Sequence, residues 1–321
     1  MIERAYNIEI AKRPSARIAE DADHGWVFGL PRGITTEQWP LDPVTGAPLA
    51  HAFTLLLPRD YRCFGTAEDG SELVGFAFFG TPADANDGGA GWSETLSRVI
   101  LEPGDDPPDD TLAPYWRIAR SQHPRLRRMT DILDYHYAMI PLTREELASD
   151  AAQPPSVPVL HGSEPFWRTR GALSAFLNGE IGLDPVIPPA EHYVAKVLVW
   201  PAPEGLDAHL ALRWSPRADD PNAGIVPAEP FGEDSVAETG YTMHYYWEGG
   251  RIETEAYREQ PWVADHAPNH IGGTMRPVQG IPLDFSPYHI GFEEWLGGFN
   301  FGGGGNAQLD FKNARFDWST G

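Results

Sequence analysis

A pattern rich in glycine, proline and tryptophan occurs near both ends of this chain. The first copy reads Gly25-Trp26-Val27-Phe28-Gly29-Leu30-Pro31 and continues with Trp39-Pro40-Leu41-Asp42. The second copy runs from Ile271 to Gly280, continues with Pro282-Leu283-Asp284-Phe285, and is followed by four glycines at 302–305. Glycine and proline mark turns, so each copy predicts short strands joined by tight loops. Two such copies predict a fold made of two related halves.

Length and composition allow one large folded domain. The chain has 321 residues, of which 41% are apolar and 12% aromatic, which is enough for a substantial core. Its 33 glycines and 31 prolines are spread along the whole length, which favours many short strands. We therefore expect an α+β fold, mostly antiparallel β-sheet with few short helices, in a single domain over residues 1–321. Its pseudo-related halves would cover 1–150 and 160–321, joined by a proline-rich loop.

Individual segments have the lengths and compositions of strands or helices. Short apolar runs bounded by proline or glycine predict buried strands, and glycine-containing turns between two runs predict hairpins. The strands expected in this way are 52–57, 73–79, 135–140, 192–200, 208–214, 241–247, 251–257, 307–311 and 314–318. The strands at 192–200 and 208–214 are expected to pair with each other. Helices are expected at 164–178, capped by Ser163, and at 143–149, capped by Thr143.

The chain is strongly acidic. It has 46 acidic and 24 basic residues, which give a formal net charge of -22. A field of this sign repels nucleic acids and anionic membranes, so we expect neither as a partner. It favours a basic protein, which would contact aspartates on exposed loops. The residues expected at that surface are Asp105, Asp106, Asp109, Asp110, Asp219 and Asp220.

The ends and apolar runs of the chain bear on its location. The first residues carry early charges and no apolar stretch of the kind found in secretory signals. No apolar run approaches the roughly 20 residues that a membrane-spanning helix needs. We therefore expect a cytoplasmic protein.

Motifs of catalytic chemistry are incomplete. No lysine follows a glycine, which excludes a Walker-type phosphate loop. The segment Gly91-Trp92-Ser93-Glu94-Thr95 begins like the nucleophile turn of a serine hydrolase but lacks the closing glycine. Glu253 and Glu255 would share one face of a strand, which fits a charged, solvent-exposed edge better than an acid–base pair. We expect no catalytic residue and no cofactor.

Metal binding receives little support from the histidine and cysteine residues. His266 and His270 have the spacing of two ligands on one helical face, but Pro268 between them disfavours a helix. Cys63 is the only cysteine, so an internal disulfide and a cysteine-based metal site are both excluded. We expect no metal site, and a packed thiol at Cys63.

The chain resembles the YwqG-like bacterial proteins, a family of unknown function. The resemblance rests on Gly29-Leu30-Pro31, Trp39-Pro40 with Asp42, and Gly75-Phe76-Ala77-Phe78-Phe79. In the later part it rests on His270-Ile271-Gly272-Gly273 and Pro277-Val278-Gln279. The family implies a mixed α+β fold with a curved antiparallel sheet. It implies no catalytic residues that could be carried over to this chain.

These observations lead to three functional hypotheses of different kinds. The first is a non-enzymatic cytoplasmic protein that binds a basic protein through its acidic surface, for example an immunity protein that neutralises a cationic toxin. The alternative is a protein that binds a small ligand or carbohydrate, or an uncharacterised enzyme, which uses exposed aromatic rings. The rings expected to stack on such a ligand are Trp26, Trp39, Tyr246 and Trp247. A structural or scaffolding domain with all its aromatic residues in the core is a third reading.

Overall fold

The computed structural model describes most of the chain. The described residues are 2–11, 24–27, 29–80, 93–157, 209–231, 234–248, 257–294, 296, 297, 299, 301, 302 and 304–321. The expected strand at 192–200, the expected helix at 164–178, and Glu253 and Glu255 lie outside these residues.

The dominant element is an 11-stranded sheet in which every neighbouring pair of strands is antiparallel. From one edge to the other the strands are β13 (Arg315–Ser319), β12 (Asn306–Asp310), β11 (His289–Glu293), β10 (His270–Ile271), β1 (Tyr6–Ile10), β7 (Leu210–Pro216), β2 (Gly25–Val27), β3 (Ala50–Leu56), β4 (Leu73–Gly80), β6 (His136–Thr143) and β5 (Arg127–Thr130). The α+β class with mostly antiparallel sheet is therefore confirmed.

The strand order consists of two sets on either side of the β1–β7 pair. Outward from β7 lie β2, β3, β4, β6 and β5, and outward from β1 lie β10, β11, β12 and β13. Each of the two central strands pairs with the set of strands that comes from the other part of the sequence. Strand β1 precedes β2 in sequence but pairs with β10, and β7 precedes β10 but pairs with β2. The first sequence pattern contains β2 and the second begins at the end of β10, and these two strands flank the central β1–β7 pair.

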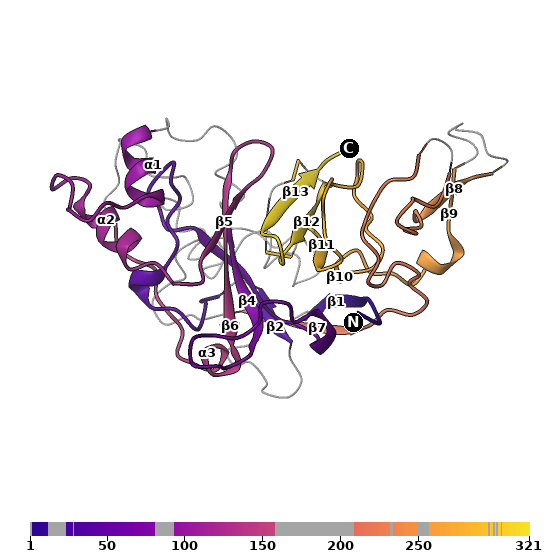
Figure 1. Ribbon diagram of the computed structural model, residues 1–321, viewed down its shortest axis with the longest axis horizontal. Helices are drawn as coiled ribbons and strands as arrows, with labels where there is room; N and C mark the ends of the chain where they lie inside the picture. Colours follow the sequence, from indigo (N-terminus) through magenta and orange to yellow (C-terminus); the bar gives the residue numbers. More distant parts are fainter. Residues whose placement is uncertain are drawn as a thin grey trace, which may run out of the picture.

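The sheet curls until its two edge strands lie side by side (Figure 1). No ladder joins β5 to β13, but side chains bridge them: Trp318 Nε1 donates to Asp131 at 2.8 Å, and Arg127 donates to the Lys312 carbonyl at 3.0 Å. Beside these contacts, the rings of Tyr137 in β6 and Phe316 in β13 pack against each other with centroids 4.0 Å apart. The main hydrophobic core fills the concave side and contains residues from both sets of strands.

Three short helices lie among the described residues, all beside the first set of strands. The first two, α1 (Glu94–Leu101) and α2 (Ala113–Arg120), pack Leu96 and Ile100 of α1 against Tyr115 of α2. The third, α3 (Arg144–Leu147), begins with the expected cap, because Thr143 and Glu146 form a capping box. None of these helices is long and apolar enough to cross a membrane.

A two-stranded sheet of β8 (Tyr245–Trp247) and β9 (Tyr257–Glu259) projects at the opposite end of the molecule from the helices (Figure 1). The strands expected at 241–247 and 251–257 would form a tight hairpin that turns at 248–250. In the structure Trp247 instead lies opposite Tyr257, so the register differs from that hairpin. The strands expected at 52–57, 73–79, 135–140, 208–214, 307–311 and 314–318 correspond to β3, β4, β6, β7, β12 and β13. The expected pairing of 208–214 with 192–200 involves residues outside the described part of the chain, in which β7 pairs with β1 and β2.

Gly75 provides a test of this packing, because β4 approaches β3 closely at a bulge in the β4–β6 ladder. A Cβ atom at Gly75 would lie 2.4 Å from the Leu55 carbonyl oxygen, whereas a Cβ at Gly104 would meet no atom within 4 Å. We expect Gly75→Ala to lower the free energy of unfolding by about 2 kcal/mol or more, and Gly104→Ala to change it by less than about 0.5 kcal/mol. Urea denaturation of both variants measures the difference. Equal effects of the two substitutions would contradict the close approach.

Candidate functional site

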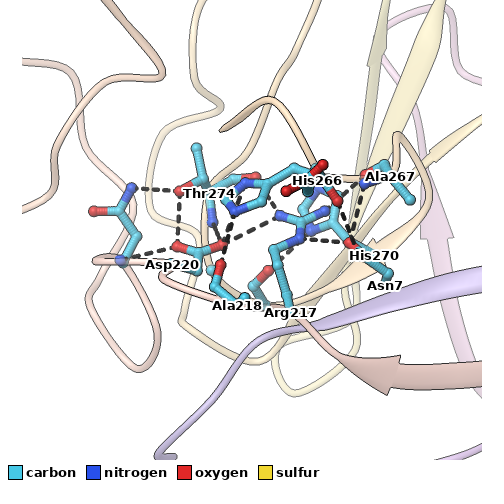
Figure 2. A network of polar contacts seen from close by, with 12 residues as sticks. Asn7, Arg217, Ala218, Asp220, His266, Ala267, His270 and Thr274 are labelled. Atoms are coloured by element: carbon cyan, nitrogen blue, oxygen red, sulfur yellow. Dashed lines mark hydrogen bonds and ion pairs between the residues drawn. The ribbon is translucent and has the colours of Figure 1, made fainter. Parts of the chain in front are cut away.

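A buried polar cluster lies where β7 ends and meets β1 (Figure 2). We call it the Arg217 junction and define it as Asn7, Arg217, Asp220, Asn222, His266 and Thr274. Arg217 is its centre, with a side chain that is 0% exposed. Its guanidinium donates through Nε to Asn7 Oδ1 at 2.7 Å and through Nη2 to the Ala267 carbonyl at 2.7 Å. Arg217, the residue directly after β7, therefore binds both β1 and the segment that leads into β10.

Asp220 is the anionic partner in this cluster and is 1% exposed. Its Oδ2 atom accepts from Arg217 Nη1 at 3.2 Å and from the Thr274 backbone N–H at 3.0 Å. Its Oδ1 atom accepts from the Thr274 hydroxyl at 2.8 Å and from the Asn222 N–H at 3.0 Å. A buried carboxylate is stable only when its lone pairs are satisfied in this way.

Asn222 extends the network to the segment that leads toward the two-stranded sheet. Its amide donates to the Thr242 carbonyl at 2.7 Å and to the Thr274 hydroxyl at 2.8 Å, and its carbonyl accepts from the Thr242 N–H. The junction thus joins four segments that are distant in sequence: β1, the loop after β7, the segment around 242, and both sides of β10.

Three buried histidines, namely His266 in the junction and His270 and His289 beside it, have lowered pKa values. Burial is the main cause in each case, and the positive charge of Arg217 contributes in the same direction. The pKa of His289 falls to about 4, and the pKa of His270 lies well below its ordinary value. His266 donates through Nε2 to the Ala218 carbonyl in its neutral form, which leaves Nδ1 as an acceptor 4.0 Å from Asp220 Oδ2. At neutral pH these rings are uncharged.

The junction is suited to holding strands together rather than to chemistry on a ligand. Arg217 and Asp220 lie inside the protein and form their hydrogen bonds with each other and with neighbouring segments. Some buried polar atoms in or beside it, namely Tyr61 Oη, His266 Nδ1 and His289 Nε2, have no hydrogen-bond partner in the part of the chain that the structure describes. Within that same part, no group of three or more metal-ligating side chains has the arrangement of a metal site.

The aspartates expected at a partner-binding surface divide into two groups. Asp105, Asp106, Asp109 and Asp110 are all exposed on the loop between α1 and α2, at the left end of Figure 1, and Asp219 is also exposed. Asp220 does not fit the expectation, because its carboxylate is buried in the Arg217 junction. Its neighbour in sequence, Asp219, points to solvent, and nothing in the local sequence distinguishes the two.

The four aromatic residues expected to stack on a ligand do not form one site. Trp26 and Trp39 are core residues, 3% and 1% exposed, and their Nε1 atoms donate to the carbonyls of Leu30 and Leu49. They therefore present no ring to solvent. Tyr246 and Trp247 lie in β8, at the other end of the molecule, where Trp247 packs against Tyr257 with ring centroids 5.6 Å apart.

Other residues singled out by the sequence have structural roles. Ser93 caps α1, because its hydroxyl accepts from the Leu96 N–H at 3.3 Å. Burial raises the pKa of the Cys63 thiol to about 12, so this cysteine is a packed and unreactive group. His270 lies in β10 rather than on a helix, and it is buried beside His289.

Comparison with known proteins adds no identification: no protein-family model, no curated protein and no solved structure matches this chain. The resemblance to the YwqG-like proteins stays a prediction from the quoted motifs.

Breaking the Arg217 junction is expected to destabilise the protein strongly. Arg217→Met would leave the Asp220 carboxylate buried without its cation and should lower the free energy of unfolding by about 3–5 kcal/mol. Arg276→Met is the matched control, because Arg276 pairs with Glu259 at 2.7 Å while both side chains are partly exposed. That variant should lose less than about 1 kcal/mol. Similar losses by chemical denaturation would show that the junction contributes no more than a surface ion pair.

The lowered histidine pKa values predict a loss of stability in mild acid. The unfolded chain protonates His289 near 6.5 and the folded protein only near 4, so the folded state binds fewer protons between these values. Stability from this group is therefore complete above pH 6.5 and falls toward pH 4, by up to about 3 kcal/mol. We expect the free energy of unfolding to fall less steeply for His289→Gln than for the wild type between pH 6.5 and 5. Parallel pH curves would contradict a buried neutral histidine.

Proposed function

We propose that this protein is a non-enzymatic binding protein that recognises a basic protein through an acidic surface. The observation that carries the proposal is the loop between α1 and α2, on which Asp105, Asp106, Asp109 and Asp110 are all exposed. Four carboxylates within six residues form a concentrated negative patch. The whole chain reinforces it with a net charge of -22.

The loop keeps most of its negative charge and a defined shape. Asp105 pairs with Arg120 at 3.1 Å, but both side chains are well exposed, so this contact is weak. Asp109 accepts from the N–H groups of Thr111 and Leu112, which fixes the loop where α2 begins. Pro107 and Pro108 restrict the backbone between the two pairs of aspartates. The carboxylates are thus held together and remain accessible to a partner.

A surface of this kind acts mainly on the rate of association. An extended negative potential attracts a positively charged protein over about one Debye length and orients it before contact. Mutations of such charges change the association rate and its dependence on salt more than the dissociation rate. A concrete form of the proposal is an immunity protein that neutralises a cationic toxin by occupying its surface.

The test begins with capture of the partner and continues with its kinetics. Proteins retained by the tagged chain from a lysate of the cells that make it are identified after washes at low and at high salt. The purified partner is then mixed with wild type and with a variant carrying Asp→Asn at 105, 106, 109 and 110. We expect the variant to associate at least about tenfold more slowly near 50 mM NaCl, with a flatter salt dependence.

The matched control removes the same number of charges elsewhere. Glu9, Glu37, Glu68 and Glu145 are exposed and lie outside the loop, and their change to Gln alters the net charge equally. This control should associate at close to the wild-type rate. An equal effect of both variants would show that net charge alone matters, and absence of any basic partner would overturn the proposal.

A further inference from the structure

The turn between β5 and β6 displays two consecutive aliphatic side chains to solvent. Ile132 is 71% exposed and Leu133 is 56% exposed. Among the exposed large hydrophobic residues in the described part of the chain, they are the only two that are adjacent in sequence. Turns of this kind are normally built from polar residues or glycine. Apolar side chains at its tip gain free energy only when something covers them.

A buried carboxylate holds this turn in one conformation. Asp131 is 6% exposed, and its Oδ1 atom accepts from the N–H groups of Leu133 at 2.9 Å and Tyr135 at 3.0 Å. Its Oδ2 atom accepts from the Tyr137 hydroxyl at 3.0 Å and from Trp318 Nε1 at 2.8 Å. Asp134 completes the turn with a φ of 62°. The aliphatic pair therefore stands on a rigid base, which lowers the entropy cost of binding.

The charged groups around the tip are acidic. Asp134 is exposed beside Leu133, and the partly buried Asp317 of β13 lies within electrostatic range of Asp131 at the base of the turn. The arginines of β5 are directed elsewhere: Arg127 donates to the Lys312 carbonyl, and Arg128 donates to the Leu41 carbonyl. An apolar tip with an acidic border complements an apolar pocket with a basic border.

We propose that Ile132 and Leu133 are the apolar anchor with which this protein holds its basic protein partner. The two side chains enter an apolar pocket of that partner, and basic residues around the pocket meet Asp134 and Asp317. This inference rests on the proposed function and assigns the association and dissociation rates to two different surfaces. The aspartates at 105–110 speed the encounter, whereas the aliphatic anchor slows dissociation, as buried apolar contacts do at the centre of interfaces.

Site-specific crosslinking tests which surface the partner covers. A photoreactive benzoylphenylalanine replaces Leu133 in one variant and Leu283 in another, and both are expressed in the cells that make this chain. Leu283 is the control because it is 86% exposed on a different turn. We expect a covalent adduct with one basic protein at position 133 and none at 283. An adduct with a second copy of the chain, an adduct with an acidic protein, equal labelling at both positions, or no adduct would overturn the inference.

Dissociation kinetics then separate the anchor from the charged loop. With the purified partner, Ile132→Ser combined with Leu133→Ser should raise the dissociation rate at least about tenfold and leave the salt dependence of association unchanged. Leu283→Ser should match the wild type. Because all three side chains are exposed, the variants should melt at the wild-type temperature. Wild-type dissociation by the double variant would refute the anchor and leave the proposed function standing, whereas the absence of any basic partner would refute both.

Discussion

The pairing of β1 with β7 holds the two sets of strands in one sheet. Its ladder runs from Tyr6 opposite Pro216 to Ile10 opposite Leu212. A one-residue slip would turn every side chain of β1 to the opposite face and carry Asn7 away from Arg217. The Arg217 junction therefore does more than join neighbours, because its hydrogen bonds are met in only one register. Without that register, neither β10 nor β2 would have its partner across the centre of the sheet.

The sequence alone predicted the fold class and the longer strands. The strands β3 and β4 are nearly continuous apolar runs between proline and glycine, and their burial on both faces requires such composition. The cap at Thr143 and the final hairpin were also readable, because their signals are local. Local signals of this kind depend on neighbouring residues and not on the rest of the chain. The exposed aspartates at 105–110 belong to the same category, since a run of acids and prolines favours solvent.

Elements that depend on distant contacts could not be predicted. Strands β2 and β10 have three and two residues, too few to show a period, and they exist because neighbouring strands supply hydrogen bonds. The same reason explains Asp220, which resembles a surface residue beside Asp219 but is buried through Arg217 and Thr274. Trp26 and Trp39 were expected at a ligand site, yet both rings are buried, Trp26 near His209 and Trp39 against Phe79. In each case the deciding partner lies far away in the sequence.

The exchange of central strands has a consequence for how the chain is made. During synthesis, β1 leaves the ribosome long before its two partners, which begin at Leu210 and His270. The first set of strands likewise lacks its inner neighbour until β7 has been translated. Neither set of strands can complete its pairing before β7 and β10 have been made, and contacts of such long sequence separation form slowly. In the cell, β1 must therefore stay soluble without these two partners until translation has passed His270.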